Sequence, residues 1–280
     1  MYQTFISTDE LSQNYSHSDW VIVDCRFALN DTEQGRKSYR EAHIPGALYA
    51  HLDEDLSSPI VPGKTGRHPL PDINVFAQTC GRWGIGEGVQ VIVYDDSVGA
   101  IASRLWWMLR WLGHNQVAVL DGGWKHWQQE ERPMTDQIPV PEARTFNAQA
   151  RMERVADAQA VMQFLESPDF RIVDARSADR YRGENETIDP VAGHIPNALS
   201  MPFMGNVGAD GLSLSPEDLK KRFRSSLGDV AADKTICYCG SGVTACHNLL
   251  AMNHAGIGDG VLYPGSWSEW ITDLDRPIGQ

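Results

Sequence analysis

The sequence predicts an α/β fold made of two tandem copies of one domain, each a parallel sheet flanked by helices. Four motifs occur twice, in the same order, with 143 to 151 residues between the copies. The pairs are Trp20–Arg26 with Phe170–Arg176, His43–Leu48 with His194–Leu199, Val91–Tyr94 with Thr235–Tyr238, and Leu120–Trp127 with Tyr263–Trp270. Self-similarity of this kind indicates a duplicated structural unit.

Short apolar segments mark the buried strands. In the first copy they are Val21–Cys25, Val91–Tyr94 and Val117–Leu120. Unbroken apolar runs of this length are typical of strands that are covered on both faces. The longer segment Ile101–Leu112 predicts a helix that ends before Gly113. Strands that alternate with helices indicate a parallel sheet.

A stretch without clear periodicity joins the two copies. Residues 131–153 are rich in proline and polar residues, which favours a connecting segment over a helix or strand. We therefore expect a non-catalytic N-terminal domain over residues 1–140, a linker over 141–153 and a catalytic C-terminal domain over 154–280.

Composition and charge exclude several classes of function. The net charge of −13 repels phosphate backbones, so nucleic acid is not an expected partner. No apolar run approaches the roughly 20 residues of a membrane helix. The N-terminus has neither a basic start nor a long apolar stretch, which predicts a cytoplasmic protein. Five scattered cysteines suit neither a disulfide framework nor a zinc site, so no metal or cofactor is expected.

The most reactive feature that the sequence predicts is the loop Cys239-Gly-Ser-Gly-Val-Thr244. It follows the strand Thr235–Tyr238 and precedes the helix Ala245–Ala255, and chemistry in parallel sheets collects at the carboxyl ends of strands. The first copy has Asp95-Asp-Ser-Val-Gly99 at the corresponding point. Only the second copy therefore carries a nucleophile there.

The glycines of this loop suit it to holding a charged sulfur. Gly240 and Gly242 let backbone N–H groups turn inward around one point, which forms an anion-binding nest above a helix N-terminus. Such a nest favours the thiolate of Cys239 over the thiol. It would also stabilise the outer sulfur of a persulfide.

With these motifs the chain resembles the two-domain rhodanese family, which includes thiosulfate and 3-mercaptopyruvate sulfurtransferases. The similarity spans essentially the whole chain: both Val-Asp-x-Arg segments, both His-Ile-Pro motifs, the cysteine loop and both Trp-x-x-Trp segments. The Gly-Ser pair after Cys239 is similar to the mercaptopyruvate branch, whereas thiosulfate enzymes typically have Arg-Lys. The resemblance implies two rhodanese-like domains and transfer of sulfur from 3-mercaptopyruvate, through a Cys239 persulfide. The acceptor would be cyanide or a thiol, such as thioredoxin or a low-molecular-weight thiol.

The resemblance also implies roles for individual residues. Ser241, oriented by His68 and Asp53, would move a proton between substrate and solvent. Arg180 matches the position that binds the substrate carboxylate, a task for which a guanidinium is suited. The remaining substrate-binding positions are those of the loop itself: Gly240, Gly242, Val243 and Thr244.

The sequence departs from the mercaptopyruvate branch at one point. That branch usually has a second arginine between the position of Arg180 and the Gly-His-Ile-Pro motif, but here the stretch 184–192 contains no cation. Arg182 is the nearest candidate for a replacement. Thiosulfate therefore stays open as the alternative donor.

Two other functions fit the sequence less well than sulfur transfer. A cysteine phosphatase needs an arginine six positions after its cysteine, but position 245 is alanine, and no Lys or Arg occurs from 239 to 254. A catalytically silent module that binds a partner is disfavoured by the intact Cys239 loop. The tryptophans at 106, 107, 111, 124, 127, 267 and 270 are expected to be core and packing residues. Arg26 and Arg176, and His43 and His194, which occur in both copies, are also expected to be structural.

Overall fold

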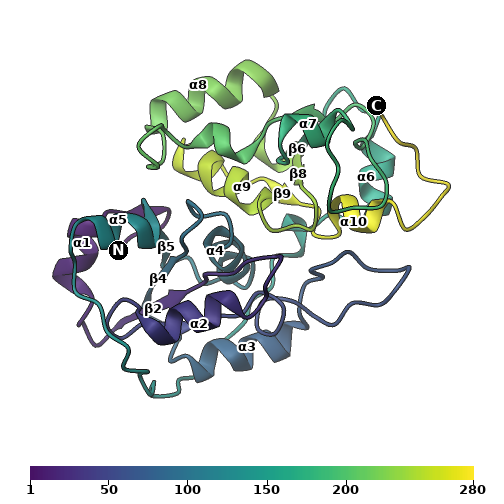
Figure 1. Ribbon diagram of the computed structural model, residues 1–280. Coiled ribbons are helices and arrows are strands. Elements are labelled where there is room, and N and C mark those ends of the chain that lie inside the picture. Colours follow the sequence, from purple (N-terminus) through teal and green to yellow (C-terminus); the bar gives the residue numbers. More distant parts are fainter. The chain divides into compact units, whose positions relative to one another are not determined.

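The structure is a computed structural model that describes residues 1–280. Its contacts divide the chain into two compact units: Met1–Ser58 with Leu70–Arg151, and Pro59–Pro69 with Met152–Gln280. Figure 1 shows most of the first unit in purple to blue and most of the second in green to yellow. The segment Pro59–Pro69 thus belongs to the second unit, although it interrupts the first in sequence.

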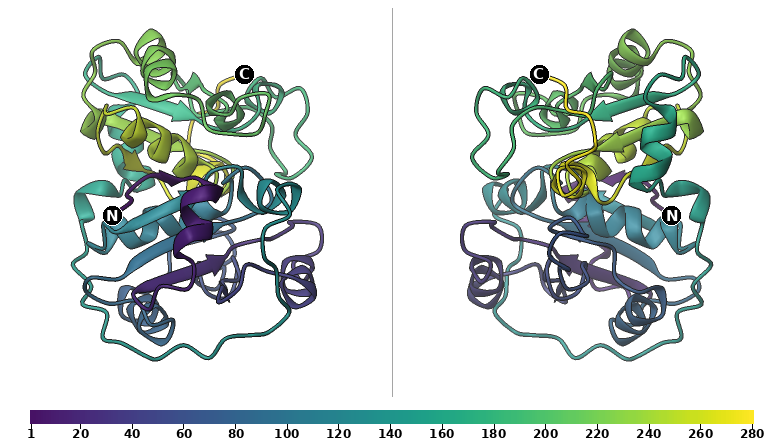
Figure 2. Two further views of the ribbon diagram at one scale, coloured as in Figure 1. Left: turned by 90° about the vertical axis from the view of Figure 1, so that its left-hand side faces the viewer. Right: turned by 90° about the vertical axis from the view of Figure 1, so that its right-hand side faces the viewer.

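The first unit is built on a five-stranded parallel sheet with the strand order β1-β5-β4-β2-β3. Its strands are β1 (Phe5–Ile6), β2 (Trp20–Asp24), β3 (Leu48–Tyr49), β4 (Gln90–Tyr94) and β5 (Val117–Leu120). Its helices are α1 (Thr8–Asn14), α2 (Gln34–Glu41), α3 (Ile73–Arg82), α4 (Ala102–Trp111) and α5 (Gly123–Gln129). Figure 2 shows the strands of this unit running between helices on either side of them.

The apolar strand residues form the core of this unit. β4 is buried at every position. Three neighbouring strands contribute Ile22, Ile92 and Ala118 to one cluster with Trp124 and Trp127. Burial of each large apolar side chain stabilises the fold by about 1.5–3 kcal/mol. All residues of α4 are buried as well, so the helix predicted at Ile101–Leu112 lies in the core of this unit.

The second unit is built on a four-stranded parallel sheet with the order β7-β6-β8-β9. Its strands are β6 (Arg171–Asp174), β7 (Leu199–Ser200), β8 (Thr235–Tyr238) and β9 (Val261–Leu262). Its α-helices are α6 (Ala158–Phe164), α7 (Ala178–Tyr181), α8 (Pro216–Leu227), α9 (Ala245–His254) and α10 (Ser266–Trp270), and its short 3₁₀ helices are η1 (Met152–Arg154), η2 (Phe203–Asn206) and η3 (Ala232–Lys234). The predicted α/β class, with parallel sheets flanked by helices, is confirmed.

The repeated arginines have the same structural role in both units. Arg26 binds Asp24 at 2.6 Å, and Arg176 binds Asp174 at 2.7 Å. All four side chains are at most 4% exposed. The pKa of Arg176 is raised: burial lowers it, but the charge of Asp174 and the hydrogen bonds to it outweigh that effect. Each pair ties the end of a central strand to the loop that follows it.

The repeated histidines are equally structural in their contacts. Nδ1 of His43 lies 2.6 Å from the carbonyl oxygen of Tyr39 and Nδ1 of His194 lies 2.8 Å from that of Tyr181. Each imidazole also stacks on the ring of the same tyrosine.

The predicted core tryptophans are buried in both units as well: Trp106, Trp107, Trp111, Trp124, Trp127, Trp267 and Trp270. No helix combines the length and hydropathy needed to cross a lipid bilayer.

Candidate active site

Cys239 lies directly after β8, one of the two central strands of the second sheet. Its backbone N–H donates to Oγ of Ser266 at 3.1 Å, and its carbonyl oxygen accepts from the N–H of Trp267 at 3.0 Å. The next carbonyl oxygen, that of Gly240, accepts from the N–H of Ser268 at 2.9 Å. The cysteine is only 2% exposed. The first turn of α10 therefore fixes the backbone on which the thiol is carried.

Gly242 turns the loop toward α9. Its φ is +74°, and a Cβ at this position would lie 2.4 Å from the carbonyl oxygen of Pro264. Both the left-handed conformation and the close approach of backbone to backbone require a residue without a side chain. The sequence-predicted role of this glycine in shaping the loop thus has a specific steric cause.

Four backbone amides of the loop after Cys239 are unused donors. The backbone N–H groups of Gly240, Ser241, Val243 and Thr244 donate no hydrogen bond within the protein. They precede the N-terminus of α9, where the first turns of a helix add positive potential. An anion held at this loop would satisfy amide groups that otherwise have no partner.

Ser241 and His68 form a buried pair. Oγ of Ser241 lies 2.7 Å from Nδ1 of His68, and the two residues are 6% and 4% exposed. His68 reaches the loop because Pro59–Pro69 packs on the start of α10: a Cβ on Gly66 would lie 2.5 Å from the carbonyl oxygen of Gly265. The resemblance implies a proton relay of Ser241, His68 and Asp53, and the structure brings the first two of these residues together.

Asp53, the third residue of that relay, belongs to the first unit. Its backbone N–H donates to Nδ1 of His51 at 3.2 Å. Burial raises the pKa of its carboxyl group. The role of Asp53 in orienting His68 stays a prediction.

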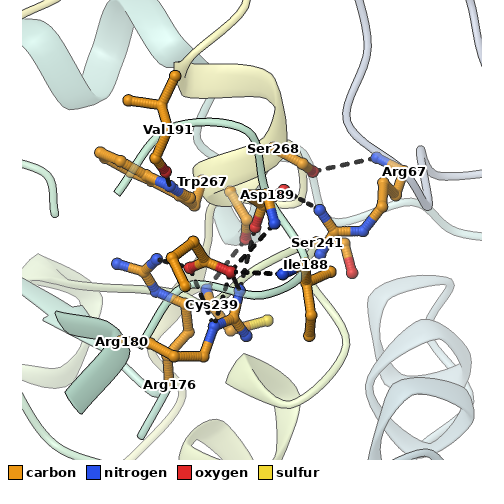
Figure 3. Close-up of polar contacts among 12 residues, drawn as sticks. Arg67, Arg176, Arg180, Ile188, Asp189, Val191, Cys239, Ser241, Trp267 and Ser268 are labelled. Atoms are coloured by element: carbon orange, nitrogen blue, oxygen red, sulfur yellow. Dashed lines mark hydrogen bonds and ion pairs between the residues drawn. The ribbon is translucent and has the colours of Figure 1, made fainter. Parts of the chain in front are cut away.

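Arg180 lies on the short helix α7 and is held by two carboxylates. Its Nη2 donates to Glu186 at 2.9 Å and to Asp189 at 3.1 Å, and its Nε donates to Glu186 at 3.0 Å. Figure 3 shows this guanidinium beside Asp189, in the same neighbourhood as Cys239. Arg182, the replacement candidate, is 53% exposed and pairs with Glu184 instead.

Arg67 also lies at this site, although the sequence predicts no role for it. Its Nη1 forms an ion pair with Asp189, and its backbone N–H donates to Oγ of Ser268 at 3.1 Å. A Cβ on Gly240 would lie 2.8 Å from Nη2 of Arg67 and 3.6 Å from Nη2 of Arg180. Two guanidinium groups therefore flank the loop next to Cys239.

The carboxylates between these arginines carry different pKa shifts. Burial pushes the pKa of Glu186 up, but hydrogen bonds from Arg180 and from the N–H groups of Asp189 and Ile188 outweigh it, and the pKa is lowered. For Asp189 burial is the largest cause and raises the pKa, although Arg67 and Arg180 oppose it. Glu186 is therefore ionised, and as a carboxylate it holds the guanidinium of Arg180 in place.

Replacing Glu186 with glutamine is expected to lower the free energy of unfolding by about 3–5 kcal/mol, because a buried ion-pair network loses one of its charges. A carboxylate with a lowered pKa stabilises the fold above its ordinary pKa of 4.5, and that stabilisation disappears as the pH falls through the lowered value. The difference between wild type and variant in urea unfolding should accordingly shrink below that pH. Glu184→Gln is the control, since Glu184 is 57% exposed and should change stability by less than about 0.5 kcal/mol. Equal effects of the two variants would contradict the anchoring role.

Comparison with known proteins places the chain among proteins of similar sequence and fold. The rhodanese-like domain family matches residues 7–130 and 157–273. A probable 3-mercaptopyruvate sulfurtransferase of Pseudomonas aeruginosa is 45% identical over 274 residues, which cover 98% of this chain and 96% of that protein. A thiosulfate sulfurtransferase of Mus musculus is 35% identical over 282 residues, which cover 97% and 93%. The structure of 3-mercaptopyruvate sulfurtransferase from Leishmania major superposes with a TM-score of 0.87 at 30% identity, covering 99% of this chain and 76% of that one.

These similarities agree with the duplicated pattern in the sequence. The two ranges matched by the family model contain the two copies of the repeated motifs, so the resemblance inferred from those motifs is confirmed. The relatives that span nearly the whole chain are sulfurtransferases of two kinds, which differ in their sulfur donor. The chain belongs to the rhodanese family and is a sulfurtransferase with two rhodanese-like domains.

Proposed function

We propose that this sulfurtransferase takes sulfur from 3-mercaptopyruvate, carries it as a persulfide on Cys239 and passes it to a thiol. The observation that carries the proposal is the loop itself. Cys239 stands at a strand end before four backbone N–H groups that have no acceptor, those of Gly240, Ser241, Val243 and Thr244. Oriented donors of this kind stabilise a negatively charged sulfur both before and after transfer.

In the first half-reaction the thiolate of Cys239 attacks the sulfur of the donor. The S–S bond forms as the bond between sulfur and C3 of mercaptopyruvate breaks, and the electron pair of that bond passes to the pyruvate enolate. The proton of the donor thiol ends on C3. The products are pyruvate and an anionic persulfide, so charge and protons balance.

In the second half-reaction an acceptor thiol removes the outer sulfur. The acceptor sulfur bonds to the outer persulfide sulfur, the S–S bond to Cys239 breaks, and the cysteine leaves as thiolate. The acceptor's proton stays with the new persulfide. Cyanide accepts the same sulfur as thiocyanate without any proton. We propose a low-molecular-weight thiol or a thioredoxin-like protein as the acceptor. We also propose that the protein works in the reducing cytoplasm, since all five of its cysteines are free.

Ser241 and His68 are proposed to move the proton from the donor thiol to C3. Replacing Ser241 with alanine is expected to lower kcat with mercaptopyruvate by about 10²-fold. Thiosulfate releases sulfite as an anion and needs no such proton, so its turnover should fall much less. Ser225→Ala on the exposed face of α8 is the control. An equal loss with both donors would remove Ser241 from proton transfer.

Thiosulfate is the second candidate donor, and one observation favours it. Two guanidinium groups, those of Arg67 and Arg180, flank the loop at Gly240, and a dianion gains more from two cations than a monoanion does. The test is kcat/KM for each donor with cyanide as the common acceptor. A preference for mercaptopyruvate of about 100-fold, roughly 2.7 kcal/mol in the transition state, supports the proposal. A preference for thiosulfate overturns the donor assignment, and activity with neither donor would favour a module that only binds a partner.

A further inference from the structure

We propose that Ser266 positions the nucleophile Cys239, through a hydroxyl group that the other copy of the domain lacks at the same place. This inference rests on the proposed sulfur transfer through Cys239 and adds a positioning residue to it. It holds for either sulfur donor, because both donors meet the same thiol. Ser266 is fully buried at the start of α10.

The backbone of Ser266 is strained. Its φ is +54°, in the left-handed region that residues with a side chain seldom adopt. Glycine adopts the same φ without this cost. A strained residue persists where the surrounding contacts hold it, and such residues cluster at active sites. The strain at position 266 therefore indicates that the serine side chain contributes something that glycine does not.

The first unit shows the same turn built with glycine. In the repeated motif Gly123 corresponds to Ser266, and its φ is +58°. The residue after Gly123 donates its backbone N–H to the carbonyl oxygen of Asp95 at 2.8 Å. The residue after Ser266 donates in the same way to the carbonyl oxygen of Cys239 at 3.0 Å. The turn and its backbone contact thus form with glycine as well, and what Ser266 adds in the second unit is its hydroxyl group.

The hydroxyl group of Ser266 makes two hydrogen bonds, which fix its direction. It donates to the carbonyl oxygen of Tyr263 at 2.9 Å, and it accepts from the backbone N–H of Cys239 at 3.1 Å. Because its one proton is used by Tyr263, a lone pair is left to face the N–H of Cys239. Ser266 and Cys239 are 0% and 2% exposed, so solvent supplies no substitute acceptor for this N–H.

This hydrogen bond fixes the peptide group that directly precedes the reactive side chain. The carbonyl oxygen of that peptide, on Tyr238, accepts from the N–H of Ala175 at 2.9 Å. The peptide is a rigid plane, and with its carbonyl held by Ala175 and its N–H held by Ser266 it does not rotate. The plane carries the Cα of Cys239, so it sets the point from which the thiol reaches a donor sulfur. A misplacement of about 1 Å at a reacting atom can cost about 10²-fold in rate.

The first test is Ser266→Gly, which reproduces the turn of the first unit and removes the hydroxyl group. The protein is mixed with 3-mercaptopyruvate without an acceptor, and the burst of pyruvate is followed in time. The variant should release as much pyruvate per protein molecule as wild type, but with a rate constant about 10- to 100-fold lower. The donor concentration that gives half the maximal burst rate should change by less than about twofold, because no donor-binding group is altered. With thiosulfate, the burst of sulfite should slow by the same factor.

Ser266→Ala separates the hydroxyl group from the strain, because alanine keeps the strained φ and has no hydroxyl. Its burst should be as slow as that of Ser266→Gly, while its Tm should lie about 2–8 °C below that of the glycine variant. Glu131→Gly is the matched control for strain relief, since Glu131 is exposed in the first unit and also has a φ of +54°. It should raise the Tm and leave the burst unchanged.

The amplitude and the rate constant of the burst distinguish positioning from folding. A purely structural role of Ser266 would lower the amplitude, because part of the protein unfolds, and would leave the rate constant of the folded part unchanged. That result would overturn the inference, as would a glycine variant whose burst is as fast as that of wild type. A slow alanine variant beside a fast glycine variant would assign the effect to strain and would also overturn it. Wild type without a burst from either donor would instead overturn the proposed sulfur transfer.

Discussion

Replacing Cys239 with serine is expected to abolish sulfur transfer, by at least about 10⁴-fold in kcat, while the fold stays intact. The hydroxyl is nearly the same size as the thiol, and the backbone contacts of position 239 to Ser266 and Trp267 do not involve the side chain. A hydroxyl, however, is not ionised at neutral pH and cannot store a sulfane sulfur. Pyruvate release and thiocyanate formation measure the two half-reactions separately.

Cys80 supplies the matched control for this variant. It is buried in α3, and burial raises the pKa of its thiol, so it is a poor nucleophile. Cys80→Ser should keep activity within about twofold even where it costs some stability. A serine variant at position 239 that still turns over mercaptopyruvate would contradict the mechanism, as would loss of activity at position 80 in a folded protein.

Replacing Gly242 with alanine is expected to destabilise the protein by about 2–4 kcal/mol and to reduce kcat/KM by at least about 10²-fold. The alanine must adopt a φ of +74°, and its Cβ would lie 2.4 Å from the carbonyl oxygen of Pro264. Because the atom that this Cβ would meet is backbone, the loop has to shift, and the amides of Ser241 and Val243 move with it. Urea unfolding and steady-state kinetics measure the two effects.

Gly256, at the end of α9, separates the two causes. It has a φ of +67°, but a Cβ there would meet no atom within 4 Å. Gly256→Ala should therefore show only the conformational cost, about 1–2 kcal/mol, with nearly normal kinetics. If both alanine variants lost the same activity, the close contact with Pro264 would not be what shapes the loop.

The sequence predicts the central strands and the helix after Cys239 well because their signals are local. The segments predicted at 117–120 and 235–238 are the observed β5 and β8. The helix predicted at 245–255 is α9, which ends one residue earlier. Apolar runs of four or five residues and a glycine-rich turn suffice for such predictions. Short edge strands such as β7, with two residues, have no periodicity to detect.

Arg67 shows what sequence reasoning could not find. The segment 184–192, which follows Arg180 in sequence, contains no cation. Arg67 comes from Pro59–Pro69, which the fold groups with the second unit. No local pattern marks this long-range packing, and the one signal on hand was that Arg67 precedes His68, already implied in the relay. The bridging role of Asp189 depends on the same packing.

The most direct test of the account is to expose the protein to 3-mercaptopyruvate without any acceptor and to measure the mass of its cysteine-containing peptides. The persulfide mechanism predicts one added sulfur atom, confined to the peptide that carries Cys239, together with one pyruvate released per protein molecule. It further predicts that added thiol removes this sulfur. Pyruvate release without labelling of Cys239, or labelling of a different cysteine, would contradict the persulfide mechanism.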